Sequence, residues 1–405
     1  MKVLIISQSG EGLGLAHKLF REGHFVEMFI RDRKFVAAGK GIITLVDNWR
    51  SRIATSDLII GDTIGFGYLE NTLKELRVPF LGISLFSDKL VSDPMYMQDI
   101  ICQSGIKFPA TFNFSSPQEA RYICDDFPEL GVVIKPLKGS SFEHSMLIKN
   151  VETFSWMLDN ILETSPLSVQ YIISGVEVSC QGWFNGRDWI SPFSISFAHK
   201  SSYGGLYPDT FSRGNVVVSL GDNPLTRSTL LKLTPLLKSQ GYKGPVNVTC
   251  IVNDQGIYVI SLSTHFEYDS IEALLEGLKE DSYDLFFETS LGVKKVMNLT
   301  NDIMISVRLH CYPVKEGLPI LGISSENIKH LFLIDVYLDD SDHYRYSGRG
   351  GVVAKVAARG RDINEARSRV YRTISNLAVY NAQYDSNIGA FTEMSMRKLR
   401  KWGYI

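Results

Sequence analysis

The chain has 405 residues, of which 44% are hydrophobic and 21% are charged, and its formal net charge is −2. This length suits two to four domains, each large enough to bury its own core. The longest apolar runs fall well short of the roughly 18 residues that a membrane span needs. A near-neutral charge gives no long-range attraction toward DNA or RNA. Composition therefore argues against a membrane protein and against a nucleic-acid partner.

Cysteine usage and the N-terminus bear on the compartment. Five cysteines are spread along the chain without a C-x-x-C pair, which predicts reduced thiols and no zinc or redox motif. The opening MKVLIISQSG runs directly into an apolar segment and lacks the basic start and cleavage site of a signal peptide. We therefore expect a cytoplasmic protein that acts on small molecules, and the sequence leaves an oligomer open.

The first hundred residues alternate apolar runs with segments of helical spacing. MKVLIIS is followed by the helical GLGLAHKLFREGH, then by the apolar DLIIG and RVPFLGIS and the helical PMYMQDIICQSG. This alternation predicts a parallel α/β domain over residues 1–108, with Gly105 and Pro109 marking its end.

Residues 109–300 change to a strand-rich pattern. The expected strands are VVIKPL, SMLIK, SVQYIIS, VEVSCQGWFNG, WISPFSISF, VNVTCIVND and GIYVISLS. Helix-like segments interrupt them at SPQEARYICDDF, VETFSWMLDNIL and LTRSTLLKLTPLLKSQG. The pattern predicts an α+β nucleotide-binding body. A last unit over residues 301–405 begins with IMISVRLHCYP and contains a helix from INEARSRVYRTISNLAVY.

Two strand pairs in the body carry candidate nucleotide contacts. Lys135 lies on a strand that leads into the loop Lys138, Gly139, Ser140 and Ser141, where an ammonium and nearby backbone N–H groups can approach phosphates. Taken alone, this segment also fits a plain hairpin.

The second strand pair contains a linker and an acid. In SVQYIISGVEVSCQGWFNG, the strand–linker edge at Gln170 and Ile172 suits an adenine, and Glu177 on the next strand suits ribose hydroxyls.

Longer segments resemble a known family. In chain order they are MKVLIISQSGEGLGLAHKL, VVIKPLKGSSFEHSM, QYIISGVEVSCQGWFNG, AHKSSYGGLYPDTFSRG, VISLSTHFEYDS, and SGRGGVVAKVAARGRDINEARSRVY with DSNIG. Their order and spacing resemble those of the phosphoribosylamine–glycine ligases, which are ATP-grasp enzymes of purine biosynthesis. The resemblance implies an N-terminal α/β domain, an ATP-grasp body over residues 109–300 that includes a small lid, and a C-terminal α+β domain.

The resemblance also implies a reaction and its cofactors. ATP and Mg²⁺ would convert the carboxylate of an amino acid into an acyl phosphate, which an amine then attacks. Cations must offset the negative charge that develops on the phosphate oxygens. His199, Lys200 and His265 are the candidate catalytic residues, with ATP held at Lys135 and Glu177.

The expected magnesium ligands differ most from the family. Where the family has a glutamate and an asparagine, this chain has Ser261 and Ser263, and His265 stands in place of a substrate-binding arginine. Neutral hydroxyls weaken the site for a hard cation. Glu267 and Asp269 are then the candidate metal ligands, unless they are solvated acids that open the following helix, SIEALLEGL.

Other positions depart as well. A lysine that reaches ATP in the family falls at Pro94, and the paired acids before the adenine linker fall at Gln170 and Tyr171. The turns that recognise phosphoribosylamine contain Gly10, Gly61 and Asp62, with Glu11 adding a negative charge. A glycine turn before a helix still suits a phosphate, although a purely structural turn is equally compatible.

Three interpretations remain. The chain is an ATP-dependent carboxylate–amine ligase with altered substrates, or a catalytically inactive relative that acts as a nucleotide-binding or assembly module. A nicotinamide dehydrogenase fits poorly, because SQSGEGLG lacks the glycine spacing of a dinucleotide-binding turn.

Overall fold

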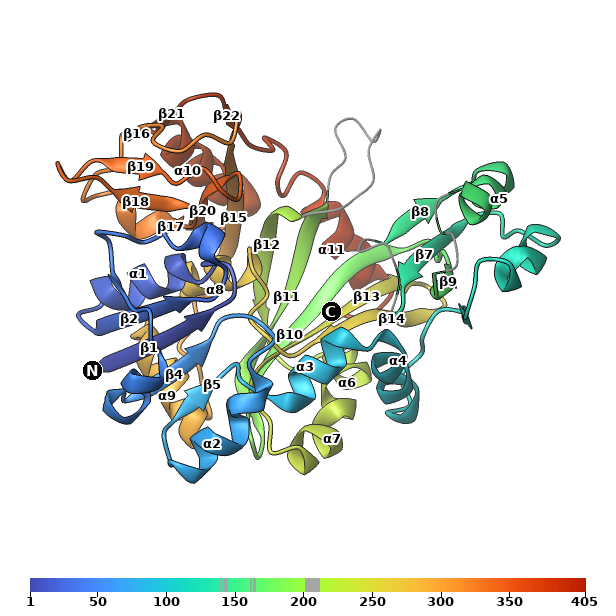
Figure 1. The fold of residues 1–405 in the computed structure, drawn as a ribbon. Coiled ribbons are helices and arrows are strands. Elements are labelled where there is room, and N and C mark those ends of the chain that lie inside the picture. Colours follow the sequence, from blue (N-terminus) through green and yellow to red (C-terminus); the bar gives the residue numbers. More distant parts are fainter. Residues whose placement is uncertain (139, 141–144, 161, 163–164, 201–211) are drawn as a thin grey trace.

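The computed structural model describes residues 1–138, 140, 145–160, 162, 165–200 and 212–405. Its first part is a five-stranded parallel sheet in the order β3-β2-β1-β4-β5, drawn in blue in Figure 1. The strands are β1 (Lys2–Ser7), β2 (Phe25–Ile30), β3 (Thr44–Leu45), β4 (Leu58–Gly61) and β5 (Phe80–Leu81). The helices of this part are α1 (Leu13–Arg21), α2 (Glu70–Glu75), α3 (Leu85–Ser92) and α4 (Pro94–Gln103). The predicted α/β alternation is confirmed.

A small antiparallel sheet follows, with the order β6-β9-β7-β8. Its strands are β6 (Thr111–Phe114), β7 (Val132–Pro136), β8 (Met146–Ile148) and β9 (Leu167–Tyr171), and α5 (Val151–Asn160) lies beside it. The segment expected to be helical around residue 120 is a short 3-10 helix, Glu119–Cys124. This sheet has a hydrophobic cluster of its own, centred on Ile134, Phe154 and Val169.

The largest element is a nine-stranded sheet with the path β14-β13-β10-β11-β12-β15-β20-β17, to which β22 is added beside β15. The strands before residue 301 are β10 (Val176–Asn185), β11 (Trp189–Lys200), β12 (Ser212–Leu220), β13 (Lys243–Asn253) and β14 (Gly256–Ser263). Those after it are β15 (Ile303–Cys311), β17 (Leu331–Leu333), β20 (Val352–Gly360) and β22 (Ala382–Gln383). Because β12 pairs with β15, the sheet continues across the expected boundary at residue 301. No sheet crosses the expected boundary at Pro109 among the described residues. The two boundaries remain predictions.

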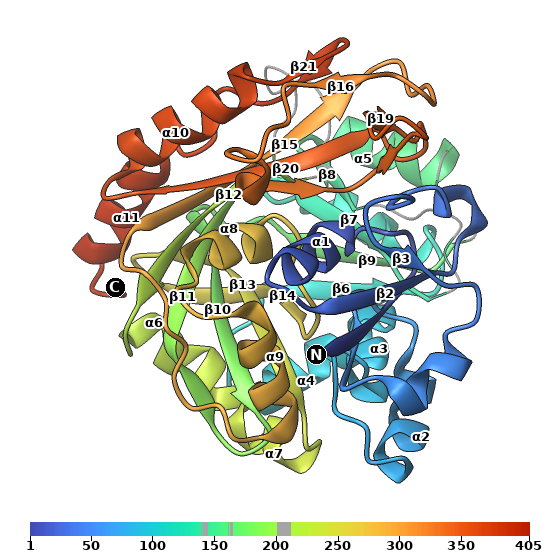
Figure 2. The same ribbon diagram turned by 90° about the vertical axis from the view of Figure 1, so that its left-hand side faces the viewer.

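Helices and short strands complete the molecule. The helices are α6 (Pro224–Ser228), α7 (Thr234–Ser239), α8 (Ser270–Gly277), α9 (Ser282–Leu291), α10 (Ile363–Ser375) and α11 (Thr392–Lys401). Two small ribbons pair β16 (Ile320–Leu321) with β21 (Ala378–Val379), and β18 (Val336–Leu338) with β19 (Tyr344–Tyr346). The helical pattern after Leu225 is split into α6, a 3-10 turn and α7, with Pro235 in the first turn of α7. Figure 2 shows α10 lying along β15 and β20.

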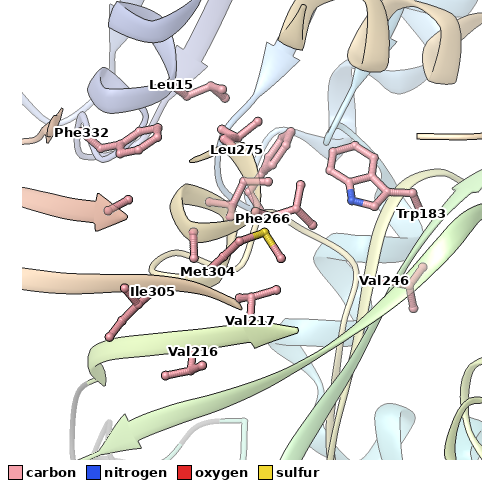
Figure 3. Close-up of a cluster of buried hydrophobic side chains, with 14 of the residues drawn as sticks. Leu15, Trp183, Val216, Val217, Val246, Phe266, Leu275, Met304, Ile305 and Phe332 are labelled. Atoms are coloured by element: carbon pink, nitrogen blue, oxygen red, sulfur yellow. The ribbon is translucent and has the colours of Figure 1, made fainter. Parts of the chain in front are cut away.

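One hydrophobic core joins the three regions of the chain. Leu15 of α1, Leu275 of α8 and Phe332 of β17 are all buried and belong to the same cluster, which Figure 3 shows together with Phe266 and Met304. Gly14 of α1 lies directly against Phe332, since a Cβ there would come within 2.7 Å of the Phe332 Cβ. The first and last regions are therefore packed against each other and not merely linked.

The structure bears on two further expectations. No helix in the described ranges is long and apolar enough to cross a membrane. All five cysteines are free thiols, as the sequence predicted.

Candidate functional site

The candidate site begins where the small sheet meets the large one. Lys135, on β7, directs its Nζ to the carbonyl oxygen of Ile260 on β14 at 3.4 Å, and the ring of Phe108 is centred 6.0 Å from the same atom. Burial lowers the pKa of Lys135 to about 8, and the positive charge of Lys200 acts in the same direction. The structure thus brings a lysine of the small sheet against strand β14 of the large sheet.

Lys200 and Glu177 form the opposite side of this site. They lie on the neighbouring strands β11 and β10, and the Lys200 ammonium forms an ion pair with Glu177. Both side chains remain accessible, with exposed fractions of 40% and 39%. They line a cavity of about 560 Å³ together with Arg213 and residues of the segment 384–395. Arg213 was not expected from the sequence, because it enters the site from β12, a strand that the sequence pattern did not indicate.

His199 lines the same cavity, but its ring is hydrogen-bonded to the backbone of the segment 384–395. The backbone N–H of Gly389 donates to His199 Nε2 at 2.9 Å, so the ring is neutral with its proton on Nδ1. Burial also lowers the pKa of His199 below its ordinary value, which favours the same neutral form. Arg367 holds the same turn by donating to the carbonyl of Ser386 at 3.2 Å. In this arrangement His199 positions the DSNIG turn against β11.

The loop after β7 is described only in part. Gly139 and Ser141 lie outside the described residues, and Lys138 is exposed. Ser140 accepts a hydrogen bond from the backbone N–H of Leu137 at 2.9 Å and donates to the carbonyl of Pro166. Its hydroxyl therefore links Leu137, at the end of β7, to Pro166.

The expected adenine linker lies at the end of β9. Gln170 is 4% exposed and donates to Thr111 Oγ1 at 3.0 Å, and the N–H of Ile172 donates to the carbonyl of Gly131 at 3.2 Å. Ile172 lines a second cavity of about 560 Å³, to which Tyr258 and Trp402 contribute. These two aromatic residues come from distant parts of the chain, and local sequence patterns carry no signal for their meeting.

The end of β14 was expected to bind magnesium. Ser261 is exposed, and Ser263 donates its hydroxyl hydrogen bond to Glu267. His265 is half-buried, and its Nδ1 has no hydrogen-bond partner among the described residues. The possible metal ligands here are thus one carboxylate, two hydroxyls and the imidazole of His265.

The carboxylate of Asp269 already has cationic partners. It is fully buried, and Arg308 Nε lies 2.7 and 2.9 Å from its two carboxylate oxygens, while Lys355 Nζ lies 3.8 Å from Oδ1. Asp269 and Glu272 also form a reciprocal cap at the N-terminus of α8. Asp269 thus caps the helix as expected, but its carboxylate is buried and paired with cations instead of being solvated.

Magnesium prefers charged oxygen ligands, usually one or two carboxylates together with substrate phosphates. With Asp269 held by Arg308, the end of β14 offers Glu267 as its carboxylate. In the described part of the chain, three metal-binding side chains converge only at Glu22, His24 and Asp281, between α1 and α9. The residues at β14 therefore do not fit the magnesium site that the resemblance implies.

The two turns of the first domain meet at a buried acid. Asp62 follows β4 and accepts hydrogen bonds from Ser7 Oγ at 2.5 Å and from the N–H of Gly12 at 2.7 Å. Burial raises its pKa to about 6. A Cβ at Gly12 would lie 2.4 Å from Asp62 Oδ2, so only glycine fits there. Gly10 has a φ of +84°, which also favours glycine.

Comparison with known proteins places this geometry in a known fold. The chain is similar to a phosphoribosylamine–glycine ligase from Thermotoga maritima, with 18% identity and a TM-score of 0.71 over 95% of this chain and 99% of that one. It is also similar to the biotin carboxylase domain of 2-oxoglutarate carboxylase from Hydrogenobacter thermophilus, a structure of a dimer with MgADP, ADP and bicarbonate. Here the identity is 13% and the TM-score 0.67, over 100% of this chain and 99% of that one.

Sequence similarity alone is weaker. A D-alanine–D-alanine ligase of Bacillus anthracis is 24% identical over 124 residues, which are 30% of this chain and 40% of that ligase. The chain thus spans less than half the length of this curated relative. No protein-family model matches the chain. The likeness in structure establishes the fold.

Proposed function

Since this chain has the ATP-grasp fold of phosphoribosylamine–glycine ligase and related enzymes, we propose that it is a diverged ATP-dependent carboxylate–amine ligase with altered small-molecule substrates. One observation carries the proposal: Lys135 of the small sheet reaches the Ile260 carbonyl of the large sheet, and its pKa is lowered by burial and by the positive charge of Lys200. An anion beside such a cation offsets both effects and stabilises its charged form.

A nucleotide phosphate is the anion that suits this position. Lys135 has no acidic partner in the ranges that the structure describes, and its long contact with the Ile260 carbonyl leaves hydrogen-bonding capacity. Charge-assisted contacts from lysines to phosphate oxygens are strong, and they are stronger still where water is excluded. Glu177 stands beside Lys200 and suits the hydroxyls of a ribose.

The base of the nucleotide would lie at the linker after β9. Ile172 offers an apolar surface there, and Tyr258 and Trp402 line the same hollow. The hollow also has polar side chains, among them Asn253 and Gln255, which can hydrogen-bond the edge of a planar base while the aromatic rings contact its face. Lys138, Gly139 and Ser141 remain proposals for phosphate contacts in the loop after β7.

The first-domain turns support a change of substrate. The N-terminal end of a helix attracts a phosphate through its free N–H groups. At α1 the N–H of Gly12 is already bonded to the Asp62 carboxylate, and Glu11 adds a second negative charge. A phosphoribosyl substrate would be repelled there, so we propose that Gly10, Gly61 and Asp62 form a structural turn or contact an uncharged substrate.

A second candidate function is a nucleotide-binding module without ligase chemistry. Ser261 and Ser263 favour it, because acyl-phosphate formation needs a metal or equivalent cations on the transferring phosphate. Glu267 is the remaining acid near that position.

The experiment combines binding with turnover. ATP and ADP are titrated calorimetrically with and without Mg²⁺, and phosphate release is then followed with a panel of amino acids and amines that includes glycine with freshly generated phosphoribosylamine. Phosphate release that depends on one amino acid supports a ligase and identifies its substrate. Nucleotide binding without any turnover favours the module. Absence of binding at millimolar ATP overturns both, and efficient glycine-dependent product formation from phosphoribosylamine overturns the altered substrate.

A further inference from the structure

A second charged hollow, separate from the cavity lined by Glu177 and Lys200, lies where the first and last regions of the chain meet. Its volume is about 530 Å³. Six cationic or titratable basic side chains line it: Lys18, Lys329, His330, Arg359, Arg369 and Arg372. Glu276 is the one acidic residue of the lining. We call this hollow the basic pocket, and we propose that it binds a small organic phosphate.

The acids of the chain neutralise only part of this charge. Three pairs are close: Lys18 with Glu22 at 2.8 Å, His330 with Glu276 at 2.8 Å, and Arg369 with Glu365 at 2.7 Å. Arg359 lies 4.0 Å from Asp302, at the limit of an ion pair. Lys329 and Arg372 have no acidic partner within the described ranges. Two full positive charges thus face the same hollow uncompensated.

Their positions on different elements favour one compact anion. Arg372 projects from α10, Lys329 from the turn before β17, and Arg359 from β20. Guanidinium groups offer paired N–H donors that match two phosphate oxygens at once. A nucleic acid would instead need basic residues along an extended surface, and this chain has a net charge of −2.

Apolar residues also line the basic pocket. Leu275 and Ala358 are buried, and Leu278 is partly buried. A pocket with both charged and apolar lining residues suits a ligand that has a phosphate at one end and a hydrocarbon or ring at the other. Inorganic phosphate alone would leave the apolar residues without a contact.

A ligand here would contact three regions of the chain at once. Lys18 belongs to α1, Leu275 to α8, and Arg372 to α10. These residues are far apart in sequence and come together only in the folded chain. The ligand therefore binds the folded state alone and raises its thermal stability by mass action.

The test uses the full-length chain and two probes, phenyl phosphate and inorganic phosphate. Binding is measured by calorimetry and by the shift of the unfolding midpoint, all in a Lys135→Ala background so that the proposed nucleotide site contributes little. The pocket variant is Lys329→Ala with Arg372→Ala. The control variant is Arg187→Ala with Lys238→Ala, which removes the same formal charge from exposed positions outside the pocket.

We expect phenyl phosphate to bind more tightly than inorganic phosphate. Its dissociation constant should rise roughly tenfold or more in the pocket variant, because two charge-assisted contacts are lost, and should stay unchanged in the control. Equal weakening in both variants means a non-specific response to net charge and overturns the proposal. Undiminished binding in the pocket variant, or no midpoint shift with either probe, overturns it as well.

Discussion

The backbone N–H of Gly12 donates a hydrogen bond to Asp62 Oδ2 at 2.7 Å, so a carboxylate at the end of β4 occupies the N-terminus of α1. Asp62 is fully buried, and Tyr268 donates to its carbonyl oxygen at 3.0 Å. The chain thereby supplies, from within, the negative charge that a helix N-terminus attracts.

Replacing Asp62 with asparagine should flatten the pH dependence of stability. The folded-state pKa, about 6, lies above the ordinary 3.8, so the folded protein holds this proton more tightly than the unfolded chain. The resulting stabilisation is complete below pH 4 and is lost as the pH rises through 6. The difference corresponds to about 3 kcal/mol. We expect Asp62→Asn to gain stability relative to the natural chain as the pH rises from 4 to 7.5, measured by urea unfolding.

Asp62→Ala is the matched control, because it removes the charge and also the acceptor. It leaves the Gly12 N–H and the Ser7 hydroxyl without their partner, and it should be about 1–3 kcal/mol less stable than Asp62→Asn at every pH. An unchanged pH slope in Asp62→Asn would contradict the assignment of this titration to Asp62.

Lys135→Met should weaken the binding of ATP by about one to two decades, since one charge-assisted contact to phosphate is lost. Calorimetric titration measures the effect. Lys149→Met is the control, because Lys149 is exposed beyond β8 of the same small sheet. Equal losses in both variants would show that Lys135 has no specific contact with the nucleotide.

The affinity for ATP should also fall as the pH rises from 7 to 9. Burial lowers the pKa of Lys135 to about 8, so its positive charge is present below that pH and lost above it. Lys135→Arg keeps a charge throughout this range, and its affinity should not change between pH 7 and 9. A parallel decline in the arginine variant would assign the pH effect to another group.

Lys355→Met should destabilise the fold by about 3–5 kcal/mol, because it leaves the buried Glu272 without its cation. The Lys355 ammonium lies 3.0 Å from Glu272 Oε1, and both side chains are buried. Urea unfolding measures the loss. Adding Glu272→Gln should recover part of it, since the amide needs no counter-charge and can still cap α8. A double variant as unstable as the sum of both single variants would exclude the coupling.

Local patterns predicted the regular elements well. The α1 helix and the strands β1 and β4 follow from apolar spacing within single segments, and Lys135 and Glu177 were assigned to strands for the same reason. The helical pattern after Leu225 was interrupted because Pro235 favours the start of a new helix. Short-range chemistry therefore accounts for most of the element types.

Contacts between distant segments escaped prediction. Asp269 could be recognised as a helix cap from its neighbours, but Arg308 and Lys355 reach it from β15 and β20. Likewise, the pairing of Gly12 with Asp62 joins residues 50 positions apart. The periodicity of a single segment carries no information about such pairings. The cations that bind Asp269, and the Asp62 carboxylate that binds the N–H of Gly12, could therefore be identified only from the folded structure.

The pairing of β12 with β15 determines which part of the molecule can move. Ser306 of β15 lies opposite Asn215 of β12, so swinging the C-terminal region outward would break the backbone hydrogen bonds that pair Gly214–Val218 with Ile303–Val307. The small sheet has no such bonds to the large one among the described residues, and its apolar cluster is its own. The small sheet β6–β9, which carries Lys135, is therefore the part that could shift without breaking strand pairing, whereas Lys200 stays with the large sheet.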